Sequence, residues 1–172
     1  MKKTKVYIDT FYYSYAISGI RSYINELVSG TEQFGDSNVQ YLFSHNINKS
    51  LNKYHIVNSS FRIIRLIFQL KYFIYKQLIL PIKVIFNRCD FLICPDYISP
   101  FLCSAKKITV IHDNFFWKYP NNYSTAWRKY FITMIKLGLM SNSQIVTTSN
   151  YSLNELKKIF INNKITYIYQ SF

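Results

Sequence analysis

A histidine and an aspartate stand side by side where a run of apolar residues ends. His112 and Asp113 follow residues 108–111, whose apolar run is continuous rather than alternating and therefore predicts a strand buried on both faces. Such strands belong to parallel sheets, in which ligands bind outside the carboxyl ends of the strands. The pair is therefore placed where a ligand would meet it. The open alternative is that Asp113 caps a turn and His112 is an ordinary loop histidine.

A second candidate is Gly19, which separates a predicted first strand at residues 5–9 from a predicted helix at residues 19–30. Apolar residues recur at helical spacing after this glycine. A glycine at the amino end of a helix lets backbone N–H groups approach a phosphate closely. One glycine is also what an ordinary turn requires, so a turn without a ligand remains the alternative.

The most unusual segment is residues 61–87, which holds basic side chains and no acidic one. On a helical wheel one narrow face holds Arg62, Arg65, Gln69, Tyr72, Lys76 and Lys83. The rest of the wheel is mainly apolar, and Pro81 predicts a kink or a break. This pattern predicts an amphipathic helix on an anionic membrane, with Arg62, Arg65, Lys76 and Lys83 facing the lipid. The alternative is a helix packed across the sheet whose solvent face happens to be basic.

The remaining elements are those of an α/β protein. Helices are predicted at residues 124–140 and from Ser152, with Glu155 as its capping-box partner, to residue 160. Further strands are predicted at residues 39–43, 54–57, 90–94, 144–148 and 165–169. Strands that alternate with helices predict a doubly wound, mainly parallel sheet with helices on both faces, in one domain spanning residues 1–172.

The bulk composition narrows the class of partner. The formal net charge of +13 on 172 residues favours a polyanionic partner, which is a nucleic acid, an anionic lipid or a phosphorylated ligand. Three cysteines without metal-ligand spacing indicate reduced thiols. We expect no transmembrane helix, because no window of about 18 residues is both apolar and uncharged. A cytoplasmic protein follows from these two expectations.

Four stretches together resemble one known family. SGIRSYINEL, CPDYISP, TVIHDNFFWKYP and VTTSNYSLNEL appear in the order and spacing of the N-terminal domain of glycosyltransferase family 4. Members of that family are retaining, nucleotide-sugar-dependent enzymes with two Rossmann-like domains, an arrangement called the GT-B fold. The resemblance implies that the chain is the acceptor-side half of a hexosyltransferase-type enzyme of cell-surface polysaccharide or glycolipid synthesis.

The resemblance also assigns roles to residues. His112 would face the transferred sugar as a catalytic residue, and Asp113 beside it would shape the loop rather than act as a base. The loop that backs the donor diphosphate would hold Gly19, Ile20 and Arg21, and Arg21 stands where the family often has a second glycine. The acceptor cleft would be lined by Asp96, Tyr97, Ser149 and Asn150.

The expected partners follow from the same resemblance. The C-terminal domain that binds most of the nucleotide sugar is missing from these residues. The alternatives are a half-enzyme, a truncated product, or a subunit whose site is completed by a separate donor-binding chain. We expect no metal and no cofactor other than the donor sugar, with a glycan or lipid-linked acceptor. Nucleic acid is not expected, because the sequence carries none of the known binding motifs. The alternative is a non-catalytic module that docks on the inner face of a membrane, or on a partner, through residues 61–87.

Overall fold

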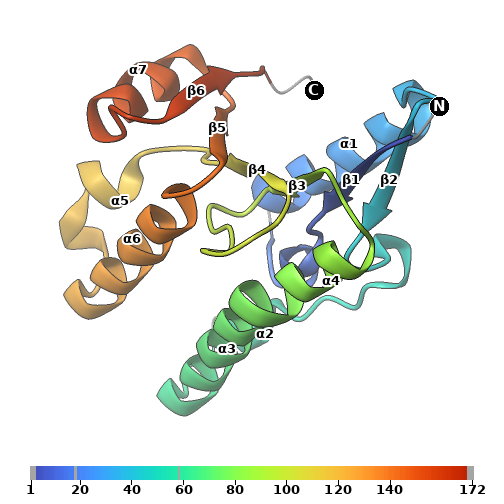
Figure 1. Cartoon of the computed structure of the whole chain (residues 1–172). Helices are drawn as coiled ribbons and strands as arrows, with labels where there is room; N and C mark the ends of the chain where they lie inside the picture. Colours follow the sequence, from blue (N-terminus) through green and yellow to red (C-terminus); the bar gives the residue numbers. More distant parts are fainter. Residues whose placement is uncertain (1–2, 18, 58, 170–172) are drawn as a thin grey trace.

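The computed structural model describes residues 3–17, 19–57 and 59–169, and its centre is one sheet of parallel strands. The strand order is β2-β1-β3-β4-β5-β6, and every neighbouring pair is parallel (Figure 1). The strands are β1 (Thr4–Ile8), β2 (Val39–Phe43), β3 (Phe91–Cys94), β4 (Lys106–Val110), β5 (Ser143–Thr147) and β6 (Lys164–Tyr167). The predicted Rossmann-like, doubly wound α/β fold is therefore confirmed.

Helices alternate with the strands except between β3 and β4, which are joined by a loop. The longer ones are α1 (Gly19–Phe34), α3 (Arg62–Ile74), α4 (Leu80–Phe86), α6 (Thr125–Leu139) and α7 (Asn150–Ile159). The shorter helical pieces are η1 (Phe11–Ser14), η2 (Ile47–Lys49), α2 (Tyr54–Val57), η3 (Tyr75–Ile79), α5 (Phe115–Lys118) and η4 (Pro120–Asn122).

Two local predictions are wrong. Residues 54–57 form the short helix α2 rather than a strand, because the Asn52 side chain accepts a hydrogen bond from the Tyr54 N–H at 3.0 Å and turns the chain there. The capping box from Ser152 is also wrong. Ser149 is the cap of α7, since its hydroxyl oxygen accepts the Ser152 N–H at 3.1 Å and places Ser152 inside the first turn.

The helices divide between the two faces of the sheet. Because crossovers between parallel strands are right-handed, α1 must lie opposite the others: β1 to β2 runs one way across the sheet and every later step runs the other way. Side chains alternate accordingly. One large core joins Tyr7, Leu92 and Ile145 to apolar residues of α3, α4, α6 and α7, whereas Ile8 and Ile24 are buried outside that cluster.

The segments α3, η3 and α4 form one long helical rod that projects from the body of the molecule (Figure 1). Its middle, η3, is a wider π-helical turn in which the Leu80 N–H donates to the Tyr75 carbonyl. Pro81 follows directly and has no N–H to donate to the turn before it. The predicted break at this proline is not found, because α4 runs through Pro81 and the departure from α-helical geometry is the π turn before it.

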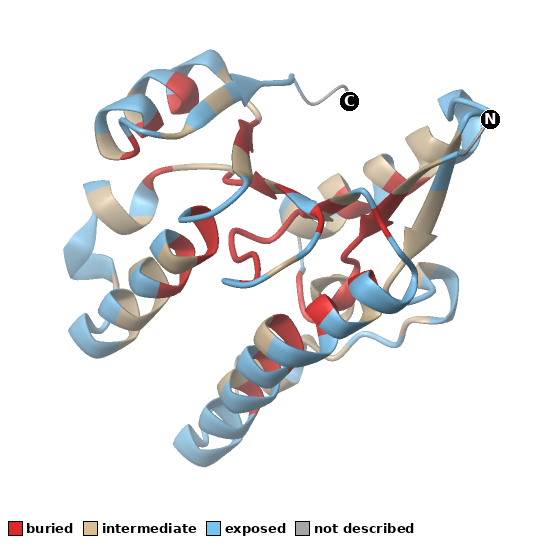
Figure 2. Ribbon diagram, viewed as in Figure 1, coloured by how far each residue is buried: buried red, intermediate tan, exposed pale blue. Residues whose placement is uncertain are grey.

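One side of this rod is apolar and open. Figure 2 shows the outer end of the rod as exposed, and the exposed fraction is 72% for Ile63, 64% for Leu66 and 59% for Leu70. Arg62 and Lys71 lie on opposite flanks of the apolar arc, since each residue turns the helix by about 100°. We call this surface the apolar rod face: Ile63, Leu66, Ile67, Leu70, Ile74, Leu78, Ile82 and Ile85.

The loop after β3 and helix α6 are held together by a close approach of their backbones. A Cβ atom added at Gly138 of α6 would lie 2.5 Å from the carbonyl oxygen of Ser99. The same region buries Lys107, whose ammonium donates to the carbonyls of Pro100 at 2.9 Å and Gly138 at 2.6 Å. Burial lowers the pKa of Lys107, and these carbonyls replace the water that the ammonium has lost.

This contact predicts that Gly138→Ala destabilises the fold by about 1–3 kcal/mol, because the new methyl group overlaps backbone that cannot move freely. Gly30→Ala in α1 is the matched control, since its Cβ would meet nothing within 4 Å and should stabilise the helix by about 0.5–1 kcal/mol. Urea denaturation of both variants measures the difference. Equal midpoints would contradict the close approach.

Candidate functional site

The carboxyl ends of β1, β3, β4 and β5 bring the candidate residues to one edge of the sheet. In the strand order, β1 lies between β2 and β3, so the chain changes direction between β1 and β3. Open parallel sheets bind ligands at such a switch point, outside the carboxyl ends of the strands.

His112 is held in a defined orientation at the end of β4. Its ring lies edge-on to Tyr23 of α1, with centroids 4.9 Å apart, and 5.5 Å from the ring of Tyr97. The ring nitrogen Nε2 lies 2.8 Å from the carbonyl oxygen of Pro95. A carbonyl only accepts, so Nε2 carries the proton. Burial lowers the pKa of His112, which keeps the imidazole neutral and leaves Nδ1 as an acceptor.

Both carboxylate oxygens of Asp113 accept hydrogen bonds from neighbouring loops. Oδ1 accepts the Phe115 N–H at 3.0 Å, and Oδ2 accepts the hydroxyl of Tyr97 at 3.0 Å. The expectation that Asp113 shapes this loop is in agreement with these bonds. Tyr97 itself has φ of 69°, a left-handed conformation that costs a non-glycine residue about 1–2 kcal/mol. Strain of this kind marks the loop as held in place by its surroundings.

The amino end of α7 is tied to the same histidine through backbone. The Ser152 hydroxyl donates to the His112 carbonyl at 3.2 Å, while the Ser149 hydroxyl donates to the Ser152 hydroxyl oxygen at 3.0 Å. Ser149 is therefore occupied by its capping role. Asn150 is the first residue of α7 and its side chain is exposed at the edge.

Gly19 begins α1 and stands one helical turn before Tyr23, on the same side of the helix. Its Cβ would meet nothing within 4 Å, so neither packing nor a left-handed φ requires a glycine here. Ile20 is half-buried against the core. The guanidinium of Arg21 lies 4.6 Å from the ring centre of Tyr13, which makes a cation–π contact rather than an open anion site.

At the switch point lies a buried ion cluster that the sequence analysis missed. The ammonium of Lys76 lies 2.6 Å from Asp9 Oδ2 and 2.5 Å from Asp96 Oδ1, and the three side chains are at most 2% exposed. Hydroxyl groups complete the cluster, because Tyr75 donates to Asp9 at 2.9 Å and Tyr72 donates to Asp96 at 2.9 Å. We call Asp9, Lys76 and Asp96 the ion triad.

The charges within the ion triad support one another. Burial by itself would lower the pKa of Lys76, but Asp9 and Asp96 outweigh it and raise that pKa well above its usual value. Burial also favours the neutral form of Asp9, yet the Lys76 charge and several hydrogen bonds lower its pKa. Burial and the neighbouring charge of Asp9 raise the pKa of Asp96 despite Lys76. The lysine is therefore charged, and its ammonium lies between the carboxyl groups of Asp9 and Asp96.

The ion triad overturns two sequence predictions. Lys76 does not face a membrane, because its side chain points inward between β1 and β3. Asp96 does not line an open acceptor cleft, since both of its oxygens are turned into the protein. Tyr97 is also buried, with its hydroxyl bound to Asp113. Of the other predicted membrane residues, Arg62 and Arg65 are exposed and Lys83 is half-buried.

A signal for the ion triad was present in the sequence. Asp9 ends one predicted strand and Asp96 follows another by two residues, and the ends of β1 and β3 are adjacent once the switch point is located. Between residues 37 and 89 the chain has eight Lys and Arg and no Asp or Glu, so a buried lysine there needs a carboxylate from elsewhere.

The comparisons with known proteins add no relative. Searches against protein-family models, curated proteins and solved structures find no match to the chain. Within the described ranges, no three His, Cys, Asp or Glu side chains come together as a metal site, and no helix is long and apolar enough to cross a membrane. The prediction that the protein needs no metal stays a prediction.

The ion triad predicts a strong effect of removing its lysine. Lys76→Met should destabilise the fold by about 3–5 kcal/mol, because two carboxyl groups would remain buried without their ammonium. Lys71→Met is the matched control on the same helix, and since Lys71 is exposed the change should stay within about 0.5 kcal/mol. Guanidinium unfolding monitored by circular dichroism gives both values; similar losses would show that Lys76 is not buried among carboxylates.

Proposed function

We propose that the chain is the acceptor-side domain of a retaining, nucleotide-sugar-dependent glycosyltransferase of the inner membrane surface. It would serve cell-surface polysaccharide or glycolipid synthesis and require a donor-binding domain for catalysis. The observation that carries the proposal is the meeting of α1, the Tyr97 loop and α7 around a neutral His112. The four stretches that resemble glycosyltransferase family 4 build this same edge.

The chemistry available at this edge suits sugar binding. With its Nε2 proton donated to Pro95, His112 offers Nδ1 to accept a hydrogen bond from a sugar hydroxyl group. The first N–H groups of α1, beginning at Gly19, have no partner within the helix and favour negative charge. Donors fixed in this way stabilise charge that develops on a leaving diphosphate. Residues of the chain would thus orient the sugar and the acceptor.

The proposal predicts the outcome of a transfer assay. A panel of labelled nucleotide diphosphate sugars is incubated with a membrane lipid extract and this chain, with or without a donor-binding domain supplied as a second chain. We expect transfer only in the completed mixture, and a loss of about 100-fold or more with His112→Ala. His55→Ala is the control, because His55 is exposed on α2, a helix that carries none of the residues placed around His112. Full activity of His112→Ala, or robust turnover by the chain alone, would contradict the proposal.

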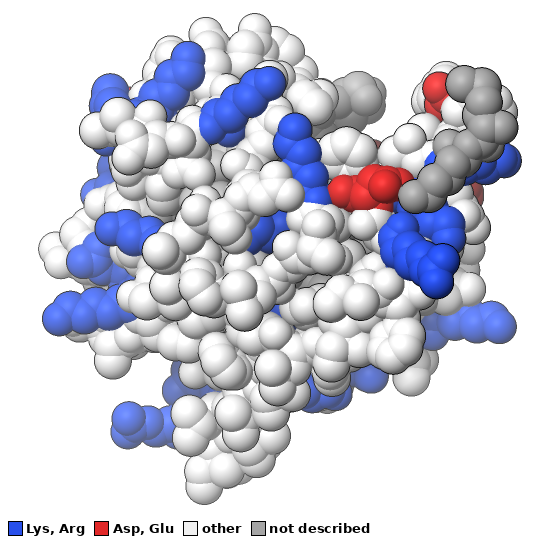
Figure 3. All heavy atoms as spheres, viewed as in Figure 1, with Lys and Arg blue, Asp and Glu red and all other residues white. Residues whose placement is uncertain are grey.

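A second candidate is a non-catalytic membrane-docking module. The apolar rod face favours it, because apolar patches of this extent on a protein surface mark interaction sites. Figure 3 shows many basic and few acidic atoms on the viewed face, and the projecting rod is mostly uncharged with basic side chains at its margin. An apolar surface flanked by basic residues is the pattern of helices that lie in the interface of anionic membranes.

This candidate predicts which leucines matter for vesicle binding. Leu66→Asn with Leu70→Asn should weaken co-sedimentation with vesicles rich in anionic lipid by about 100-fold, since each leucine contributes about 1.5 kcal/mol or more when buried. The matched pair is Leu51→Asn with Leu102→Asn, whose side chains are 75% and 70% exposed and lie off the rod. Equal losses for the two pairs would exclude docking through the rod, and equal binding of the wild type to neutral vesicles would exclude a preference for anionic lipid.

A further inference from the structure

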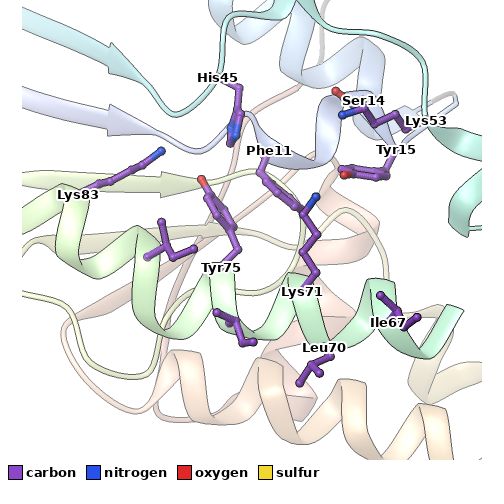
Figure 4. A pocket seen from close by; sticks show the side chains of 12 residues that line it. Phe11, Ser14, Tyr15, His45, Lys53, Ile67, Leu70, Lys71, Tyr75 and Lys83 are labelled. Atoms are coloured by element: carbon purple, nitrogen blue, oxygen red, sulfur yellow. The ribbon is translucent and has the colours of Figure 1, made fainter. Parts of the chain in front are cut away.

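A cavity opens between the rod and the carboxyl ends of β1 and β2. Its volume is about 530 Å³, which is within the range of small-molecule sites. One wall is the flank of the rod, and the other consists of η1 and the loops after β2 (Figure 4). The cavity adjoins the ion triad, because Tyr75 lines it and also donates to Asp9. We call it the lysine pocket.

Basic side chains reach the lysine pocket from separate parts of the chain. Lys53 comes from the loop before α2, whereas Lys71 and Lys83 come from the rod. In Figure 4, Lys83 and His45 both point toward the hydroxyl end of Tyr75. The Lys83 ammonium is 5.9 Å from the centre of the Tyr75 ring, and the His45 ring is 5.7 Å from it. No Asp or Glu lines the cavity among the described residues.

The rest of the lining is apolar. Phe11 stacks on Tyr75 with ring centroids 4.1 Å apart and forms the floor beside His45. On the rod side, Ile67, Leu70 and Ile74 line the cavity and also belong to the apolar rod face. A single ligand can therefore place a charged group among the lysines and an apolar chain along the rod.

We propose that the lysine pocket binds the phosphate of one anionic phospholipid headgroup, while the acyl chains of that lipid lie along the apolar rod face. This proposal rests on the membrane-docking candidate and is independent of sugar transfer. It makes the rod a surface that selects a lipid as well as one that adheres to membranes.

Charge complementarity is the first argument for a phosphate. The stretch between residues 37 and 89 supplies all four basic lining residues, His45, Lys53, Lys71 and Lys83, and contains no acidic residue to neutralise them. Asp9, which accepts a hydrogen bond from the lining residue Tyr75, is buried and paired with Lys76. Ammonium groups that repel one another and lack a protein counter-ion gain most from an added anion.

The hydrogen bonds of His45 make its ring a reporter of an anion in the lysine pocket. The Ser44 hydroxyl donates to Asp9 Oδ1 at 3.0 Å, so its oxygen accepts a hydrogen bond from the N–H of His45 Nδ1 at 3.0 Å. In neutral His45 the other nitrogen, Nε2, then has no proton. Burial lowers the pKa of His45, and the nearby charges of Lys83, Lys53 and Lys71 lower it further. Asp9 acts in the opposite direction but does not outweigh them. The negative charge of a phosphate bound in the pocket would raise the pKa of His45. The protonated ring would then donate a hydrogen bond from Nε2.

The direct test uses a short-chain lipid that stays in solution. Binding of dihexanoyl phosphatidylglycerol is measured by NMR titration, which also follows the imidazole of His45. We expect saturable binding and a rise in the pKa of His45. The double variant Lys71→Gln with Lys83→Gln should bind at least tenfold more weakly, because two charged donors are lost.

Two control measurements distinguish binding in the lysine pocket from general attraction to the positive charge of the protein. Arg62→Gln with Arg65→Gln removes the same charge from the exposed part of the rod and should change affinity less than twofold. Inorganic phosphate should bind at least tenfold more weakly than the lipid, because it lacks the chain that contacts Ile67 and Leu70. Equal losses in the two double variants would overturn the pocket, and phosphate binding equal to the lipid would overturn the lipid as ligand. Vesicle binding by the wild type without short-chain binding would leave docking intact and refute only this site.

Discussion

The position of the rod depends on one buried interaction, the ion pair of Lys76 with Asp9 and Asp96. A charged lysine in the interior is tolerated only when carboxylates and hydrogen bonds replace its water, and here two strand ends and two tyrosines supply them. The lysine sits in the π turn, which widens the helix just before Pro81. That turn therefore fixes the rotation of the rod about its own axis.

The rotation of the rod explains its surface. Because Tyr72, Tyr75 and Lys76 face the sheet, the residues on the opposite arc face outward, and these are Ile, Leu and Phe. The rod thus buries both apolar and polar side chains where it meets the protein, and it still exposes a second, apolar arc to solvent, which an ordinary surface helix does not. The flank of the rod at Lys71 closes over the lysine pocket. The ion triad, the apolar rod face and the pocket are consequences of one helix orientation.

The sequence was sufficient for those features that depend on local pattern. The continuous apolar run of residues 108–111 and the helical spacing after Gly19 identified β4 and α1, and the alternation of elements identified the parallel sheet. The grouping of His112 with Tyr97 and α7 at one edge was expected only from the resemblance of the four stretches to one family. Residues 54–57 were misjudged because four apolar and aromatic residues fit either a helix or a strand, and a single Asn52 bond decided it.

Which face of the rod points toward the core was not predictable in the same way. A helical wheel sorts residues into arcs but does not say which arc faces the core, and the usual assumption placed Lys76 outside. Its carboxylate partners lie in β1 and after β3, so the strand order must be known before they can be found. The hydroxyl groups of Tyr97 and Ser149 are likewise unavailable to a ligand because they bond to Asp113 and Ser152. Those bonds could not be predicted from the sequence pattern.

The outward apolar face of the rod is tested most directly by a nitroxide label attached at residue 70 in place of Leu70. The partly exposed Cys103 is first replaced by serine so that only the intended site is labelled. Electron paramagnetic resonance compares collisions with oxygen and with a water-soluble nickel chelate. In buffer the label should meet the chelate freely, and with phosphatidylglycerol vesicles it should lose the chelate and gain oxygen. A label that is shielded in buffer, or that still meets the chelate on vesicles, would contradict an outward apolar face that binds lipid.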